Sequence, residues 1–161
     1  MGIIPSENLS LFQELLIEIN NNKKLNIDEV NLEGFISHDA PLRQMVPIIA
    51  ESKKIKKLIL SYNNLAWEGA EEQLINLFTQ NKSISHLDIS KTEIKGETLI
   101  KILEKNQLIT NIKFDRGTNF ITSKQADIIE EKLKARQKSE EKSDTGPKQE
   151  PSTLAKSAKI S

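Results

Sequence analysis

The sequence contains no cysteine and only 4% aromatic residues, and its 23 Lys and Arg residues equal its 23 Asp and Glu residues. The absence of cysteine excludes disulfide bonds, thiolate zinc sites and a cysteine nucleophile. Nucleic-acid surfaces need a basic excess and aromatic stacking platforms, and this chain is poor in both. We therefore expect no nucleic-acid partner.

Long apolar runs are also missing. No segment approaches the roughly 18 apolar residues that are needed to span a bilayer, so we expect no membrane insertion. The start of the sequence, MGIIPSENLS, has no basic region followed by a long apolar run, so we expect no secretory signal peptide. Together with the absence of cysteine, this favours a cytoplasmic location.

Two apolar patterns alternate along the chain. The segments LLIEI (15–19), MVPII (45–49), LINLF (74–78) and LIKIL (99–103) each have apolar residues at their first, second and fifth positions, which predicts one face of a helix. Each is followed by a strand-like set spaced 0, 3, 5, which predicts one buried strand face. These sets are Ile27, Val30, Leu32; Ile55, Leu58, Leu60; Ile84, Leu87, Ile89; and Ile109, Ile112, Phe114. Their starts are 28, 29 and 25 residues apart, a period that indicates a solenoid.

The central units carry a specific resemblance. One central segment reads Ile55-Lys-Lys-Leu58-Ile-Leu60-Ser-Tyr-Asn63-Asn-Leu65. It is similar to a leucine-rich repeat of the ribonuclease-inhibitor-like subclass, which contains a helix. The stretch from Ile84 to Asn106 matches again, and the resemblance covers roughly residues 25 to 122.

The repeat asparagine position is the most informative part of this resemblance. In this family the asparagine side chain turns inward and pairs with loop backbone that would otherwise be buried without partners. Asn63 occupies that position and Thr92 replaces it in the next unit, whereas Phe35 and Gly117 in the flanking units cannot play the role. We expect Asn63→Ala to cost about 1–3 kcal/mol of stability.

These patterns predict an α/β fold. It is a short right-handed solenoid with about four parallel strands on the concave face, helices on the convex face and helical caps. We assign residues 1–24 to an N-terminal capping helix, 25–122 to the repeats, 123–137 to a C-terminal capping helix and 138–161 to a disordered polar tail. The inner face of the second cap is predicted to be Ala126, Ile129 and Leu133. Pro47 lies within MVPII, so that helix either starts late, near Leu42, or is kinked.

The concave face is the predicted partner surface. Strand alternation exposes Glu29, Asn31, Glu33; Lys57, Ile59, Ser61; His86, Asp88, Ser90; and Asn111, Lys113, Asp115. Parallel pairing aligns them in rows, of which one is Glu29–Lys57–His86–Asn111 and another is Asn31–Ile59–Asp88–Lys113. The alternative is a solvated sheet face without a partner. Ile59, Tyr62 and Trp67 are candidate anchors, but the two aromatic residues can equally well cover the top of the core.

Catalysis has little support. His86, Asp88 and Ser90 share one face, but neighbouring positions on a strand face are about 6–7 Å apart, too far for a direct relay. There is no nucleophile elbow, metalloprotease motif or phosphate loop. We expect no enzyme activity, no metal and no cofactor.

The amino-terminal residues fit a short acylation motif. Met1-Gly2-Ile3-Ile4-Pro5-Ser6 matches the N-myristoylation pattern, with Gly2 as the acceptor. The alternative is a chance match in which Ser6 caps the first helix.

The resemblance implies a non-enzymatic, monomeric protein-binding module. Short proteins of this kind resemble host-directed effectors of intracellular bacteria, in which case the tail would be a type IV secretion signal and the protein would enter a host cell. One alternative is a GTPase-activating or other cytosolic regulator, which would need a catalytic arginine among Arg43, Arg116 and Arg136. Another is a structural assembly module.

Overall fold

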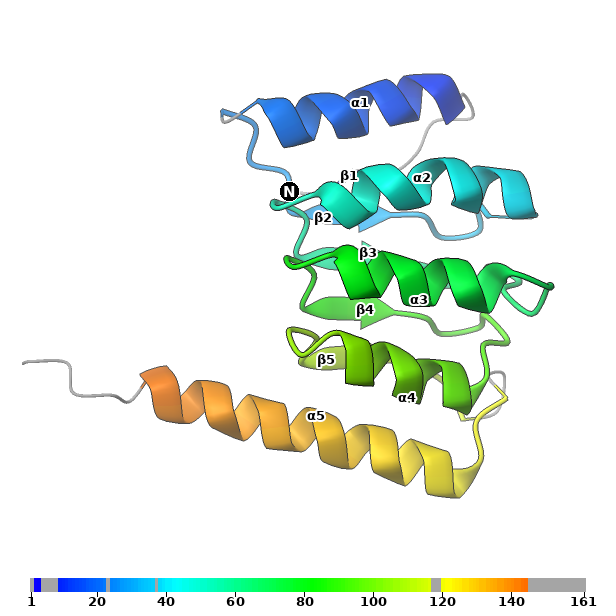
Figure 1. Cartoon of the computed structure of the whole chain (residues 1–161), viewed down its shortest axis with the longest axis vertical. Coiled ribbons are helices and arrows are strands. Elements are labelled where there is room, and N and C mark those ends of the chain that lie inside the picture. Colours follow the sequence, from blue (N-terminus) through cyan, green and yellow to red (C-terminus); the bar gives the residue numbers. More distant parts are fainter. Residues whose placement is uncertain (1, 4–8, 23, 37, 117–119, 145–161) are drawn as a thin grey trace, which may run out of the picture.

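Five strand-and-helix units stack along one axis (Figure 1). The computed structural model describes residues 2–3, 9–22, 24–36, 38–116 and 120–144. The strands are β1 (Gly2–Ile3), β2 (Glu29–Asn31), β3 (Lys57–Ile59), β4 (His86–Asp88) and β5 (Asn111–Lys113). The helices are α1 (Leu9–Asn21), α2 (Asp39–Glu51), α3 (Ala70–Gln80), α4 (Gly96–Lys105) and α5 (Ser123–Asp144).

The strands form one parallel sheet in the order β1-β2-β3-β4-β5, and the helices pack side by side as a second layer. The predicted α/β solenoid is therefore confirmed. The sheet has one more strand than the four predicted, because Gly2 and Ile3 pair with Glu29 and Val30. The first unit thus contains a strand as well as its helix, and the proposed cap Ser6 lies outside the described residues.

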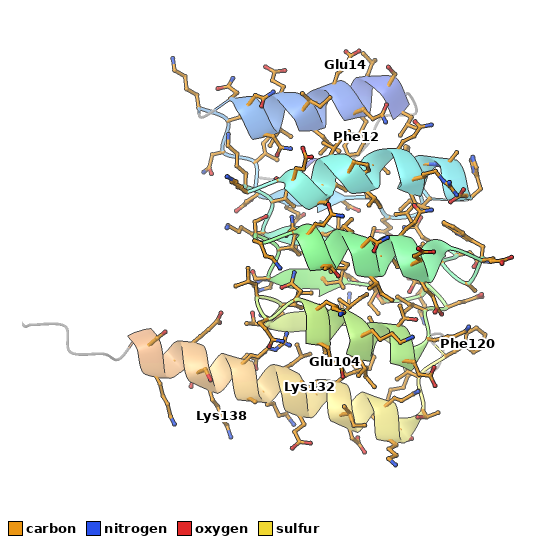
Figure 2. All side chains as sticks on the ribbon, in the orientation of Figure 1. Phe12, Glu14, Glu104, Phe120, Lys132 and Lys138 are labelled. Atoms are coloured by element: carbon orange, nitrogen blue, oxygen red, sulfur yellow. The ribbon has the colours of Figure 1, made fainter. Side chains whose placement is uncertain are left out.

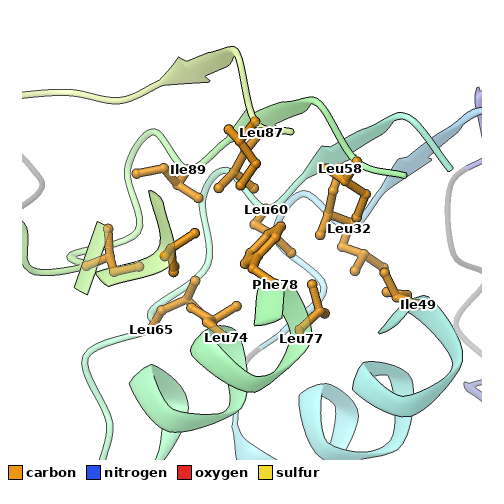
Figure 3. Packing of buried hydrophobic residues seen from close by; sticks show 14 of the residues in the cluster. Leu32, Ile49, Leu58, Leu60, Leu65, Leu74, Leu77, Phe78, Leu87 and Ile89 are labelled. Carbon is orange, nitrogen blue, oxygen red and sulfur yellow. The ribbon is translucent and has the colours of Figure 1, made fainter. Parts of the chain in front are cut away.

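Apolar residues from both layers meet in one continuous core (Figure 3). Leu58 and Leu60 from the β3 segment pack with Leu74 and Phe78 of α3, and all four side chains are at most 1% exposed. In Figure 2, Phe12 of α1 lies toward the body while Glu14 points away from it. The repeated apolar spacing therefore corresponds to the face that each element buries.

The helix around Pro47 starts earlier than one predicted alternative. Helix α2 begins at Asp39 and runs through Pro47 to Glu51, so the late start near Leu42 is wrong. Pro41 falls in the first turn, where a missing N–H breaks no helical hydrogen bond. Pro47 sits on an exposed side of the helix, and its ring leaves the carbonyl of Arg43 without the usual helical donor.

The last helix is longer than predicted. Ala126, Ile129 and Leu133 are buried as expected, but α5 continues to Asp144, seven residues beyond the predicted boundary at 137. The extension is exposed and projects beyond the stack, with Lys138 near its start (Figures 1 and 2). Glu and Lys are good helix formers, so the low apolar content of residues 138–144 did not require disorder. Residues 145–161 lie outside the described part of the chain.

Candidate protein interface

The strand register produces a continuous surface on the side of the sheet away from the helices. Val30, Leu58 and Leu87, in the middle of their strands, are buried, so the residues on either side of each face outward. We define the sheet face by two rows that run across β2 to β5. These rows are Glu29–Lys57–His86–Asn111 and Asn31–Ile59–Asp88–Lys113. The register therefore pairs the same residues that the repeat period aligned.

The charges on the sheet face pair with one another. Lys57 Nζ lies 2.8 Å from Glu29 Oε2, and Lys113 Nζ lies 3.5 Å from Asp88 Oδ2. Each pair joins neighbouring strands and is partly exposed, so each contributes little to stability. The pairs make the sheet face a neutral pattern of alternating charge rather than an acidic or basic patch.

His86 and Asn111 form the polar end of the first row. His86 Nδ1 lies 2.8 Å from Ser85 Oγ, and His86 Nε2 lies 3.0 Å from Asn111 Nδ2. Gln137 of α5 donates to Asn111 Oδ1 at 3.2 Å and to the carbonyl of Thr110 at 2.8 Å. The last helix thus reaches the edge of the sheet face, a contact that the strand pattern alone does not reveal.

Two predicted surface residues are buried. Ser61 and Ser90 are 4% and 6% exposed, so their assignment to the partner surface is wrong. They follow the last residues of β3 and β4, where strand alternation stops and the chain turns. The Ser90 hydroxyl donates to Asp88 Oδ1, which also accepts the Ser90 N–H at 3.0 Å.

Beyond the ends of the strands, Glu33 is exposed while Asp115 is half-buried. Asp115 Oδ2 accepts the backbone N–H of Lys91 at 3.1 Å and lies 3.8 Å from Lys91 Nζ. Asp115 therefore fixes the loop after β4 rather than standing free on the sheet face.

The three residues considered for catalysis do not form a relay. The Ser90 hydroxyl is bonded to Asp88, whereas His86 contacts Ser85 and Asn111. A serine nucleophile needs a histidine base within hydrogen-bond reach, and this arrangement pairs Ser90 with a carboxylate instead. Among the described residues, no group of three or more His, Asp or Glu side chains is placed to hold a metal ion.

Tyr62 and Trp67, predicted together, have different environments. Tyr62 is 63% exposed, whereas Trp67 is half-buried and packs against the core. The indole Nε1 of Trp67 is buried and has no hydrogen-bond partner among the described residues. Trp67 therefore covers the core, and Tyr62 is the aromatic side chain of this pair that a partner can reach.

Asn63 is buried and links two successive units. Its Nδ2 donates to the carbonyls of Leu32 at 2.9 Å and Leu60 at 2.7 Å, and its Oδ1 accepts the N–H of Ile36 at 2.6 Å. At the matching position, the Thr92 hydroxyl donates to the carbonyl of Ile89 at 2.6 Å. Asn63 thus satisfies backbone groups of its own unit and of the unit before it.

The flanking units lack such a residue. Phe35 packs instead against Phe12, with ring centroids 6.2 Å apart, and Gly117 lies outside the described residues.

A second set of polar residues closes the helix ends, and the apolar patterns of the sequence did not predict it. Asn81 donates to the carbonyl of Ile49 at 2.8 Å, and Asn106 donates to the carbonyl of Asn81 at 3.0 Å. We call Asn81, Asn106 and Arg136 the helix-end ladder. The signal was present in the sequence, because Asn81 and Asn106 each precede by three residues the first apolar residue of a strand set.

Each arginine is engaged in an interaction. Arg43 pairs with Asp39 at 2.6 Å, and Arg116 pairs with Glu130 at 3.0 Å, a contact that raises the pKa of Arg116. Arg136 donates to the carbonyls of Asn106 at 3.0 Å and Ile109 at 2.7 Å, and burial lowers its pKa.

Gly2, the predicted acylation site, lies in β1 and is exposed. A Cβ at this position would lie 2.8 Å from Glu29 Oε1, so the absence of a side chain leaves room for Glu29. Acylation of Gly2 stays a prediction.

Repeated parallel strands, each followed by a packed helix, define a short leucine-rich-repeat solenoid. The assignment to the ribonuclease-inhibitor-like subclass stays a prediction. None of the helices in the described segments is long and apolar enough to cross a membrane.

Comparison with solved structures finds the same fold in other proteins, among them the following two domains. The chain is similar to the leiomodin-1 actin-binding site 2 domain, with a TM-score of 0.60 and 14% identity over 98% of this chain and 99% of that chain. It is also similar to the tropomodulin C-terminal domain of Caenorhabditis elegans, with a TM-score of 0.58 and 14% identity over 84% of this chain and 99% of that chain. No protein-family model and no curated protein sequence matches the chain.

Proposed function

We propose that this chain is a non-enzymatic protein-binding module whose partner contacts the sheet face. The observation that carries the proposal is the unbroken pair of rows across four parallel strands, which forms a continuous, largely polar surface. Solenoids of this kind bind partners on the extended surface that their repeats create.

Actin is the first partner to test. The leiomodin-1 domain that shares this fold over nearly its whole length is described as an actin-binding site. The similarity supports a shared scaffold, and the sheet face of this chain carries its own pattern of charges. On the basis of this shared scaffold, we propose as a specific hypothesis that the chain binds actin directly, in monomeric or filamentous form.

A charge swap tests the sheet face without breaking its ion pairs. Exchanging Glu29→Lys with Lys57→Glu keeps this pair but reverses the polarity that a partner meets, and Asp88 is left unchanged because it also accepts hydrogen bonds from Ser90. We expect the double variant to bind actin about tenfold or more weakly, because reversed charges oppose those of the partner. Its unfolding midpoint should stay close to that of the wild type, since exposed pairs contribute little to stability.

The matched control reverses exposed charges on the helix layer. Glu97→Lys with Lys101→Glu changes polarity on α4, in the helix layer instead of the sheet. Fluorescence titration of monomeric actin and co-sedimentation with filaments give the affinities. Equal binding by the sheet-face swap and the wild type would reject the sheet face as the interface. Failure of the wild type to bind either form would reject actin as the partner.

The regulator hypothesis has less support. A GTPase-activating protein needs an arginine that is free to enter the nucleotide site. Arg43 and Arg116 pair with carboxylates, and Arg136 closes the end of α4. A GTP-hydrolysis assay over a panel of small GTPases tests this alternative, and no observation favours a purely structural assembly role.

The host-directed effector hypothesis, with entry into a host cell, rests on analogy and stays a prediction. Residues 138–144 of the proposed secretion signal belong to α5. Translocation of a reporter fused to residues 138–161 tests the signal, and retention of the reporter in the bacterium would reject it.

A further inference from the structure

Three successive units place the corresponding loop residue in the left-handed backbone region. Gly34 has φ 64°, Tyr62 has φ 57° and Lys91 has φ 57°. The conformation is fixed by ladder bonds beyond the strands, in which Gly34 N–H donates to the Ser61 carbonyl and Tyr62 N–H to the Ser90 carbonyl, both at 3.1 Å. Glycine adopts this region without steric cost, whereas a residue with a Cβ is strained there.

Tyr62 makes few contacts within the chain that would compensate for this strain. Its side chain is 63% exposed and is not part of the buried core. Its hydroxyl has no hydrogen-bond partner within the described segments. A large aromatic residue is thus held in an unfavourable conformation, on a backbone fixed by hydrogen bonds, with most of its surface in solvent.

The position next to Tyr62 in the preceding unit is open. A Cβ atom built on Gly34 would have the Tyr62 carbonyl oxygen as its nearest neighbour, at a distance of 4.0 Å. On the other side, Lys91 is held by Asp115. The space that a side chain at residue 34 would fill is therefore available to a partner.

We propose that Tyr62 is the anchor of the partner interface, and that an apolar side chain of the partner protein occupies the space above Gly34 beside it. This inference rests on the proposed function, because it extends the sheet face past the end of β3. Tyrosine is enriched among the residues that dominate protein interfaces, since it buries a large area with few rotatable bonds.

Four variants test the anchor in the actin assay described above. Tyr62→Ala keeps the strain and removes the ring, so affinity should fall about thirtyfold, as for a dominant interface residue. Tyr62→Phe keeps the ring and should bind within about threefold of the wild type. Gly34→Asn fills the open space with a residue that tolerates positive φ, so it should weaken binding while the protein stays folded. Tyr62→Gly removes both ring and strain, so it should bind as weakly as Tyr62→Ala but unfold at a higher urea concentration than that variant.

Each outcome is decisive. Unchanged binding by Tyr62→Ala or Gly34→Asn would overturn the anchor while leaving the sheet face as the interface. A lower urea midpoint for Tyr62→Gly than for Tyr62→Ala would show that a Cβ at this position stabilises the fold, which overturns the strain argument. Absence of actin binding by the wild type would reject the proposed partner and with it this anchor.

Discussion

The two edges of the solenoid are built differently. At the helix-to-strand edge, where each helix leads into the next strand, Ser52, Asn81 and Asn106 are at most 2% exposed and their side chains bond to the backbone. At the strand-to-helix edge, Tyr62 and Lys91 are exposed with positive φ. Asn63 and Thr92 are also buried at this second edge, so it combines buried polar contacts with strained, exposed residues.

The difference follows from the polarity of the helices. A helix leaves its last carbonyls without donors, and asparagine and arginine side chains supply those donors at the helix-to-strand edge. At the opposite edge, the residues that precede α2, α3 and α4 make no side-chain capping bond. Buried polar contacts therefore stabilise both edges, whereas exposed residues with positive φ lie at the second edge.

The largest expected loss of stability comes from the helix-end ladder. Asn81 Oδ1 accepts the N–H groups of Ser83 at 2.9 Å and Ile84 at 2.8 Å, and Asn81 is 0% exposed. Asn81→Ala leaves two buried donors without partners, so we expect a loss of about 3 kcal/mol in the free energy of unfolding. Urea denaturation measures it, with Asn76→Ala on the exposed side of α3 as a control that should change stability by less than about 0.5 kcal/mol. Equal losses at both positions would contradict the ladder.

A smaller effect is expected from the buried polar residues of the other edge. Asn63→Ala removes bonds to two units and should cost about 1–3 kcal/mol, because it leaves the buried Ile36 N–H without a partner and removes one of the two donors to the Leu32 carbonyl. Thr92→Val removes the bond from the Thr92 hydroxyl to the Ile89 carbonyl and should cost about 1 kcal/mol. Urea denaturation of both variants gives the two losses, and an Asn63→Ala loss well below about 1 kcal/mol would contradict the role of Asn63 in linking units.

Much of this architecture could be predicted because the apolar core residues recur at a regular spacing along the chain. Leu58 and Leu87 recur at matching positions in successive units, and parallel stacking then aligns the residues beside them, such as Lys57 with His86. The rows of the sheet face follow from this alignment alone. The charge pairing of Glu29 with Lys57 follows as well, since the two residues are register partners.

The wrong or missing predictions concern residues at which the repeated apolar spacing ends. Ser61 and Ser90 were expected on the surface because alternation was extended past strands that are only three residues long. Strand β1 was missed because Gly2 and Ile3 carry too few apolar residues to show the pattern. The positive φ of Tyr62 and Lys91 was hidden because only the unit containing Gly34 has the residue that usually indicates such a turn.

The smallest expected effect is a gain, and it tests the strain on which the role of Tyr62 depends. Lys91 and Lys95 lie in one loop, are both exposed, and make weak ion pairs, with Asp115 at 3.8 Å and Glu71 at 3.4 Å. They differ in backbone conformation, since φ is 57° at Lys91 and −78° at Lys95. Lys91→Gly relieves strain and should raise the free energy of unfolding by about 0.5–1 kcal/mol. Lys95→Gly only increases the freedom of the unfolded chain and should lower it by a similar amount.

The sign of the difference between these two variants in urea denaturation is the measurement that matters. Each substitution removes one exposed ion pair, and these two losses of stability nearly cancel in the comparison, because exposed pairs at such distances contribute little. A gain at residue 91 with a loss at residue 95 assigns the effect to the left-handed backbone, and the same argument then applies to Tyr62, whose φ is also 57°. If both substitutions lower stability equally, the strand-to-helix edge is unstrained, and the exposure of Tyr62 becomes the sole structural reason to regard it as an anchor.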